Sequence, residues 1–413
     1  MKYRHNLSIV GSLGDALEGR RIVLCVTGSV AAYQAPEIAR LLIRYGADVI
    51  PVMTGDALRM VGEELLRWAT GNDPVTNITG ALEHVVLAGK ETGADLILVA
   101  PATLNTITKI AAGVADTPVT LVVQTALGSG IPLLIAPAMH EPMFLNRLFL
   151  DAVEKLKSIG VEFIEPMLAE EKAKIALPEV ICEHVIRKLY RIKFPQGTKA
   201  LVTAGATVEY IDPIRVVTNL SSGLMGMAIA RECFRCGCDT ILITGRTSLP
   251  PPPHIERINI LTSKELINIL EQKLKHGRTK IYFGTIAVAD YKPAVKHEEK
   301  IKTETAEKLM LEFTRTEKII ERVKSISPDT IVVGFKAEYG IPEEELRNRA
   351  EKLLEHADIV YASDVSKPTS IFGSPTTEGI IVTREGYFKK IEGKKKEEVA
   401  ELLLELTYSM LNT

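Results

Sequence analysis

The sequence is poor in cysteine, with five in 413 residues. That number is too small for the disulfide framework of a secreted scaffold. Three of the five are close together, at Cys233, Cys236 and Cys238. Their C-x-x-C-x-C spacing could ligate a metal, but no further Cys/His pair follows at zinc spacing. We therefore expect small buried side chains there, with a metal site as the weaker alternative.

The chain also lacks a charge excess and a long apolar run. Its formal net charge is −2, so nothing favours a nucleic acid or an anionic membrane as partner. The longest apolar runs, such as Leu96–Pro101 and Ile131–Ala136, are strand-sized and far short of the roughly 20 residues that span a membrane. Residues 1–20 carry charges but no signal-peptide core. We expect a cytoplasmic protein.

The chain is too long for one ordinary domain, since domains usually have roughly 100–200 residues. Short buried-strand patterns alternate with helical patterns in both halves, which predicts α/β architecture with mostly parallel sheets. The basic, aperiodic stretch 191–198 suggests a boundary, giving an extension at 1–18 and domains at 19–190 and 191–413. We expect two Rossmann-like or flavodoxin-like domains, the second with an edge hairpin around Arg384–Gly386.

The expected strands and helices follow from these patterns. Strands are expected at 21–27, 48–53, 96–100, 133–136, 200–203, 240–244, 280–283, 330–335 and 358–361, and helices at 33–45, 104–112, 148–159, 178–190, 224–236, 264–275, 318–325, 343–356 and 395–411.

Four loops in the first half follow expected strands and are rich in small or hydroxyl residues. An open α/β sheet binds ligands at the carboxyl ends of its strands, so these loops predict a ligand site. The loops contain Gly28-Ser29, Thr54-Gly55, the segment APATLNT at 100–106 and the segment PAMHEPM at 137–143.

The first half resembles the flavin-containing cysteine decarboxylase family over about residues 19–190. The segments TGSVAAY, APATLNTITKIAAGVADT and LEHVVL carry the resemblance. It implies bound FMN and nominates His84 of LEHVVL as the catalytic acid/base or electrostatic guide. It further implies FMN contacts from Gly28, Ser29, Thr54, Ala100, Thr103, Asn105, Thr106 and Met139, and substrate contacts from His140 and Met143. FMN would supply a transient oxidation of the substrate thiol that makes loss of CO₂ possible.

Two features depart from that family. His140 occupies the place of a usual asparagine in P-x-M-N-x-x-M, and its charge would vary with pH. Many members also have a Gly-rich flap with a proton-donating cysteine, but residues 167–177 read MLAEEKAKIAL. The proton donor is therefore unassigned.

The second half again places loops after expected strands. The loop AGAT at 204–207 could approach a ligand, and Ser221 or Ser222 could cap the helix that begins at Leu224. Arg215 and Asn219 lie just before these serines, and capping does not explain them. Asp290 and Lys300 are of the types that bind hydrated Mg²⁺ and triphosphate oxygens.

This half resembles the phosphopantothenate–cysteine ligases over about residues 199–413. The ordered segments VEYIDPIR, VVTNLSSGLMG, AVADY, EEKIK, VGFKAE and SDVS carry the resemblance. It implies that Asn219 processes an acyl-nucleotidylate and that Arg215 orients a phosphate or carboxylate. It further implies nucleotide contacts from Ala287, Asp290, Lys300, Glu317, Ile320, Phe335 and Lys352, with Asp290 also near Mg²⁺.

Together the halves resemble the bifunctional decarboxylase–ligases of coenzyme A biosynthesis. The implied ligands are 4′-phosphopantothenate, cysteine and CTP or ATP. The implied assembly is a homo-oligomer, such as a dodecamer that combines trimeric contacts of the decarboxylase domains with dimeric contacts of the ligase domains. A non-catalytic flavin-binding regulator that retains only the ligase is the alternative. A nicotinamide-dependent dehydrogenase is disfavoured, because neither half has G-x-G-x-x-G after a strand.

Overall fold

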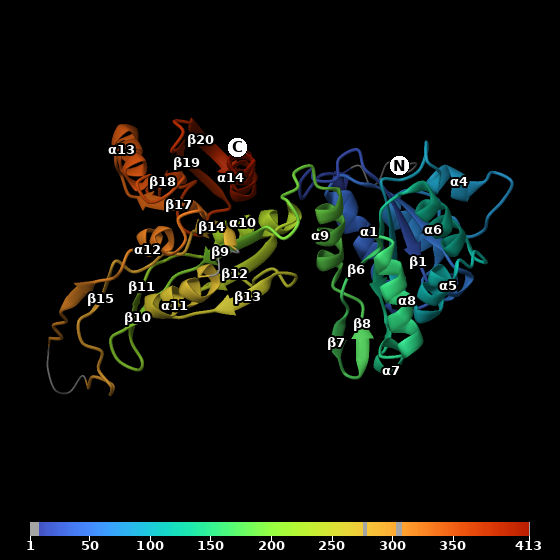
Figure 1. Ribbon diagram of the computed structural model, residues 1–413, viewed down its shortest axis with the longest axis horizontal. Coiled ribbons are helices and arrows are strands. Elements are labelled where there is room, and N and C mark those ends of the chain that lie inside the picture. Colours follow the sequence, from blue (N-terminus) through green and yellow to red (C-terminus); the bar gives the residue numbers. More distant parts are fainter. Residues whose placement is uncertain (1–7, 276–278, 303–307, 413) are drawn as a thin grey trace. The chain divides into compact units, whose positions relative to one another are not determined.

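The structure is a computed structural model that describes residues 8–275, 279–302 and 308–412. The chain divides into two compact units, Met1–Tyr190 and Arg191–Thr413. Each unit is an α/β fold built on its own sheet (Figure 1). None of the described helices is long and apolar enough to cross a membrane.

The N-terminal unit contains a parallel five-stranded sheet with the order β2-β1-β3-β4-β6. This is the flavodoxin-like order, in which the chain reverses direction across the sheet between β1 and β3. The strands are β1 (Arg21–Val26), β2 (Asp48–Met53), β3 (Leu96–Ala102), β4 (Leu133–Pro137) and β6 (Glu162–Phe163). A smaller antiparallel sheet joins β5 (Met139–His140), β7 (Met167–Ala169) and β8 (Lys172–Lys174).

Helices cover both faces of this sheet. One group joins α1 with α3 and α9, and the other joins α4, α5, α6 and α8. Residues of β1 and β3 such as Val23 and Ile97 pack with the second group in one core. The helical elements are η2 (Val30–Gln34, a 3₁₀ turn), α1 (Ala35–Arg44), α2 (Gly55–Met60), α3 (Glu63–Thr70), α4 (Glu83–Ala88), α5 (Leu104–Ala112), α6 (Pro118–Ser129), α7 (Glu141–Phe144), α8 (Arg147–Ser158) and α9 (Pro178–Leu189).

The C-terminal unit contains an eight-stranded sheet with the order β13-β12-β9-β14-β17-β18-β19-β20. The first six strands have the Rossmann order 3-2-1-4-5-6, which reverses between β9 and β14. The strands are β9 (Lys199–Ala204), β12 (Asp239–Thr244), β13 (Glu256–Asn259), β14 (Thr279–Gly284), β17 (Ile331–Glu338), β18 (Ile359–Asp364), β19 (Thr376–Thr383) and β20 (Phe388–Lys395).

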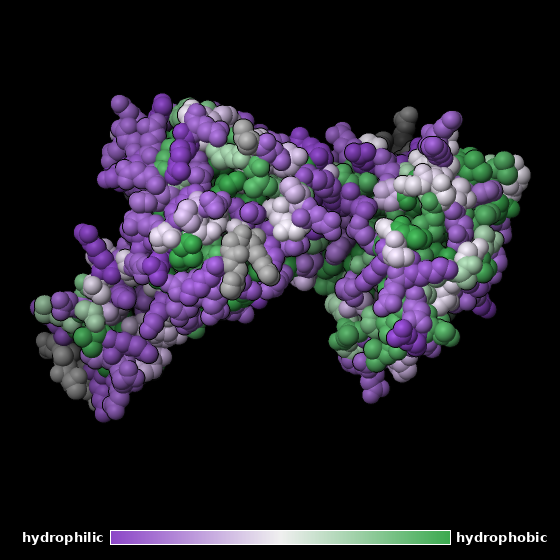
Figure 2. Space-filling model, viewed as in Figure 1, coloured by the Kyte–Doolittle hydropathy of each residue, from purple (hydrophilic) through white to green (hydrophobic). Residues whose placement is uncertain are grey.

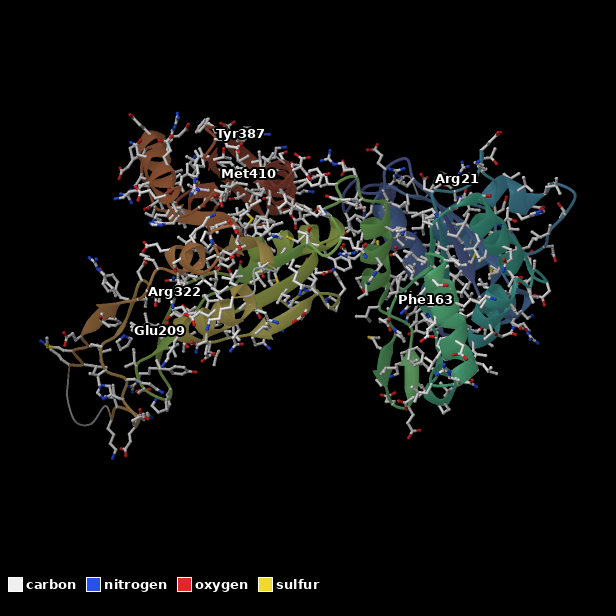
Figure 3. All side chains as sticks on the ribbon, in the orientation of Figure 1. Arg21, Phe163, Glu209, Arg322, Tyr387 and Met410 are labelled. Carbon is white, nitrogen blue, oxygen red and sulfur yellow. The ribbon has the colours of Figure 1, made fainter. Side chains whose placement is uncertain are left out.

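The last two strands form the expected antiparallel edge hairpin, and Tyr387 lies at its turn (Figure 3). The helices are α10 (Leu224–Arg235), α11 (Ser263–Leu274), α12 (Ile319–Ile326), α13 (Glu343–Leu353) and α14 (Lys396–Leu411). Two antiparallel strand pairs extend from this unit: β10 (Val208–Tyr210) with β11 (Val216–Thr218), and β15 (Tyr291–Pro293) with β16 (Phe313–Arg315).

The predicted fold class is confirmed, and all nine predicted strands are present. Two local predictions are wrong. The helix expected from Tyr33 begins at Ala35, after a 3₁₀ turn that Ser29 caps. The N-cap of α10 is Gly223 at φ +82°, because Ser221 and Ser222 instead accept from the N–H groups of Gly223 and Leu224 in short local turns.

The three clustered cysteines are buried at the end of α10 and just after it. Burial raises the pKa of the Cys233 and Cys236 thiols well above the ordinary value. The described residues contain no group of three or more His, Cys, Asp or Glu side chains that could hold a metal.

Candidate functional site

Thr27 joins the ends of β1 and β3, where the strand order of the N-terminal unit reverses. Its buried hydroxyl donates to the carbonyl of Pro101 at 2.8 Å and accepts from the N–H of Thr103 at 3.1 Å. The Thr27 N–H also donates to the Pro101 carbonyl. These bonds fix the two loops that flank the usual ligand crevice of this strand order.

Hydroxyl side chains begin the helical elements around this crevice. Ser29 accepts from Ala31 N–H, Thr54 from Ala57 N–H and Thr103 from Thr106 N–H. Gly28 lies so close to α2 that a Cβ atom there would be 2.3 Å from the Cβ of Asp56. The structure therefore brings the predicted residues Gly28, Ser29, Thr54 and Thr103 together at one edge of the sheet.

The predicted residues after β3 and β4 belong to the same edge. Ala138 donates to the carbonyl of Ala102 at 3.0 Å, which places Met139 beside the end of β3. Met139 packs against the core, whereas His140 is exposed. Ala100 lies within β3, Thr106 is buried in the first turn of α5, and Asn105 beside it is exposed.

A short hairpin pairs with the segment that carries His140. In β8, Lys172 is opposite His140 and Ala173 is opposite Met139. The tip of the hairpin is Glu170-Glu171, both at positive φ, and the carbonyl of Glu171 accepts from Glu141 N–H. This hairpin occupies the sequence position where a longer Gly-rich flap would be expected. Met143 follows in α7 and is exposed.

His84 lies on α4, which packs on α6. Its Nδ1 atom is buried, and no described residue forms a hydrogen bond with it. An unpartnered buried ring nitrogen is uncommon, because burial of such an atom costs free energy. Leu82, Val85 and Val86 of the same segment are exposed, and Figure 2 shows the apolar surface over α4.

Thr203 has the corresponding role in the C-terminal unit, between β9 and β14. Its hydroxyl donates to the carbonyl of Phe283 at 3.1 Å and accepts from the N–H of Ile286 at 3.2 Å. The Thr285 hydroxyl donates back to the Thr203 carbonyl. Helix α10 packs against this junction at Gly226, where a Cβ atom would be 2.5 Å from the Thr285 hydroxyl.

A pocket of about 760 Å³ opens at this junction. It is bounded by the loop before α10, the loops after β14 and β16, and the ends of β17 and β18. Six of the residues predicted for the second half line it: Asn219, Ala287, Asp290, Glu317, Ile320 and Phe335. The volume is typical of a small-molecule site.

Two of these side chains have partners in the structure. Asn219 donates its amide N–H to the carbonyl of Val288 at 3.1 Å. The Asp290 carboxylate, which was predicted to lie near Mg²⁺, forms an ion pair with Lys318 at 2.6 Å. A cation that used Asp290 would have to displace Lys318.

Arg215, Lys300 and Lys352 are not in the lining of the pocket. Arg215 donates to Asp212 at 3.0 Å and to the carbonyl of Ile301 at 3.0 Å, next to the exposed Lys300. Burial of Asp212 opposes its ionisation most, but the N–H groups of Ile214, Arg215 and Ile301 and the Arg215 charge hold its pKa below 3.8. Lys352 is exposed on α13.

Lys396 lines the pocket although the sequence analysis did not single it out. The residue begins α14 and is 8% exposed, whereas Lys394 and Lys395 before it are exposed. Three consecutive lysines before a helix are typical of a solvated surface, so no pattern in the sequence distinguishes the third.

Both sheets reverse their strand order, which is where open α/β sheets usually bind ligands, and the C-terminal sheet has a pocket at that place. Residues 11–190 match the Flavoprotein family, and residues 195–410 match the DNA/pantothenate metabolism flavoprotein C-terminal domain.

Three curated relatives carry the name coenzyme A biosynthesis bifunctional protein CoaBC. The protein from Thermococcus kodakarensis is 45% identical over 98% of this chain and 99% of its own length. The Methanocaldococcus jannaschii protein is 36% identical over 96% and 95%, and the Escherichia coli protein is 30% identical over 94% and 97%. The chain belongs to this CoaBC family.

Proposed function

We propose that the chain is a bifunctional enzyme of coenzyme A biosynthesis. Its C-terminal unit joins 4′-phosphopantothenate to cysteine through an acyl-nucleotidylate, and its N-terminal unit decarboxylates the product to 4′-phosphopantetheine. The observation that carries the proposal is the match to relatives named as bifunctional over both units, 98% of the chain in the most similar of the three.

In the N-terminal unit, FMN is the cofactor that the Flavoprotein family and the strand-end crevice support. Gly28, Ser29, Thr54, Thr103 and Asn105 would hold it, and the bound flavin would supply transient oxidation of the substrate thiol. The close approach of Gly28 to Asp56 packs the first strand-end loop against α2, so a side chain at position 28 would displace the loop that is proposed to contact the cofactor. Further contacts are assigned to Ala100, Thr106 and Met139.

His84 would move a proton or steer charge beside the substrate. Its buried Nδ1 has no hydrogen-bond partner among the described residues, and a bound cofactor or substrate would supply one. The presence of His84 favours catalysis over the non-catalytic regulatory alternative. His140 and Met143 would bind the substrate, since both are exposed on the segment next to the hairpin.

In the C-terminal unit, the nucleoside triphosphate would bind in the pocket against Ala287, Glu317, Ile320 and Phe335, with Asp290 near its Mg²⁺. Asn219 would stabilise charge as the cysteine amine attacks the activated carboxyl group. Arg215 anchors the loop that carries Lys300, and it would position Lys300 for phosphate; Lys352 is a further candidate. CTP and ATP are the two candidate nucleotides of this proposal.

The flavin assignment can be tested with paired glycine variants of the full chain. Purified protein should be yellow with noncovalent FMN. Gly28→Ala should lower the FMN content, because its new methyl group would collide with Asp56, whereas Gly55→Ala should not, since no atom lies within 4 Å of a Cβ there. Folded wild-type protein that takes up no added FMN would contradict the proposal.

A further inference from the structure

Lys396 is an isolated cation in the wall of the C-terminal pocket. It is 8% exposed, and its backbone N–H donates to the Pro375 carbonyl at 3.0 Å. Over the described ranges, no carboxylate pairs with its ammonium group and no side chain accepts from it. Burial lowers its pKa from the ordinary value, although Glu397 opposes the shift. Removing an unpaired charge from water is costly, so a structure that keeps one needs a reason.

The other charged side chains in the lining are already neutralised. Lys318 pairs with Asp290 at 2.6 Å, and Lys336 pairs with Glu338 at 3.3 Å. Glu338 also forms an ion pair with Arg349 at 2.6 Å, and Glu317 forms one with Arg322 at 3.6 Å. Of the lysines in the lining, Lys396 is therefore the one that forms no ion pair with a described residue.

Hydroxyl groups in the same lining are also occupied. Tyr361 and Thr377 share a hydrogen bond of 2.6 Å. The Ser370 hydroxyl donates to the carbonyl of Glu378 and accepts from its N–H. None of these lining residues supplies an anion, so the charge of Lys396 is available to a molecule in the pocket.

We propose that Lys396 binds an anionic oxygen of a ligand in this pocket, either a phosphate or a carboxylate. The inference rests on the proposed ligase function, which supplies two ligands with such oxygens: the nucleoside triphosphate and 4′-phosphopantothenate. Lys396 thus acts as a binding residue and complements the pocket residues that the sequence predicted.

The test measures the affinity of the full-length protein for CTP, ATP and 4′-phosphopantothenate, each alone, by titration calorimetry. Lys396→Met removes the charge and keeps the length of the side chain. The affinity for the ligand that Lys396 contacts should fall by about 10- to 100-fold, as expected for the loss of a hydrogen bond to a charged group. Lys396→Arg should retain most of the affinity, and Lys395→Met, at the exposed neighbour, should bind like the wild type.

Stability provides a second readout. Because the folded state holds the Lys396 pKa below its ordinary value, the unbound protein is destabilised at pH values below that ordinary value. Lys396→Met should therefore raise the melting temperature of the unbound protein at neutral pH, and the gain should shrink as pH rises. A variant that is more stable yet binds more weakly supports a binding role.

Unchanged affinity of folded Lys396→Met for all three ligands would overturn the inference. If that variant does not fold, the pH dependence of ligand affinity in the wild type tests the inference. Its affinity for the contacted ligand should fall as pH rises through the pKa of Lys396, and an affinity that does not change with pH overturns the inference. Failure of the ligase proposal is distinguishable, because wild-type protein would then bind none of the three ligands.

Discussion

Two buried threonines organise the ligand crevices at the residue scale. Thr27 and Thr203 each donate to a carbonyl of the next strand and accept from an N–H just beyond it. Each threonine thus links the two loops that follow the paired strands where the strand order reverses. The two halves share this device although no repeat is evident between their sequences.

Replacing either threonine with valine should damage its own unit. Thr203→Val leaves the Phe283 carbonyl and the Ile286 N–H without their partner, at a cost of about 1–3 kcal/mol for buried groups. We expect lower pyrophosphate release with normal FMN content. Thr27→Val should lower FMN content and leave pyrophosphate release intact. Equal loss of both properties in both variants would refute this division.

Asn219 should act after the nucleotide has reacted. Losing one donor that stabilises developing charge typically costs on the order of 10²–10³ in rate. Asn219→Asp should therefore form the acyl-nucleotide but transfer it slowly to cysteine, whereas Lys300→Gln should weaken its formation. A quench experiment without cysteine measures trapped intermediate and pyrophosphate. The opposite pattern, with intermediate only in Lys300→Gln, would show that the two roles are reversed.

At the scale of elements, the sequence predicts buried parallel strands well. Runs such as Arg21–Val26 and Asp48–Met53 are apolar after their first residue and are each followed by a threonine, so the pattern of the sequence locates them. The β7–β8 hairpin is different. Its turn uses Glu170 and Glu171 at positive φ, where asparagine or glycine is usual, and no local pattern predicts it.

The candidate site was predictable where a segment resembles a known family. Asn219 directly follows β11 and Phe335 lies within β17, both in segments that carry the ligase resemblance, and both line the pocket. Lys396 was not predictable, because its burial depends on the packing of α14 against α10 and β20. Figure 3 shows Met410 near the far end of that helix. The ion pair between Asp290 and Lys318 was likewise not predictable from the sequence, because it depends on the folded structure.

The Asp212 carboxylate links its own loop to the loop that contains Ile301, and we call this set of hydrogen bonds the Asp212 clamp. Asp212 accepts from the N–H groups of Ile214, Arg215 and Ile301 at 2.8, 2.7 and 3.2 Å. Its folded pKa lies below the ordinary 3.8, so its stabilising effect is present above that value and is lost as pH falls through the folded pKa.

Asp212→Asn should therefore lower the melting temperature of the C-terminal unit at neutral pH. The difference in melting temperature between variant and wild type should narrow as the pH falls below 3.8 and passes through the folded-state pKa of the wild-type carboxylate. Hydrogen exchange at Ile214, Arg215 and Ile301 should be faster in the variant. Asp329→Asn, at an exposed aspartate, is the control. An unchanged exchange rate at all three positions would exclude the clamp.

On the scale of the whole molecule, the account assigns one activity to each unit. The units separate at Tyr190, and each has its own sheet reversal and its own loops. The predicted assembly into trimers, dimers or a dodecamer stays a prediction, which sedimentation analysis of the purified chain can measure. The assignment of ligation to the C-terminal unit and decarboxylation to the N-terminal unit is the central claim, because it predicts which variant blocks which reaction.

The most direct test follows product masses from 4′-phosphopantothenate, cysteine and either CTP or ATP with FMN-loaded protein. The wild type should release pyrophosphate and CO₂ and yield 4′-phosphopantetheine. His84→Asn should stop at 4′-phosphopantothenoylcysteine with normal pyrophosphate release, since only the N-terminal unit is altered. A wild type that makes neither product, or a folded His84→Asn variant that loses both activities equally, would contradict the account.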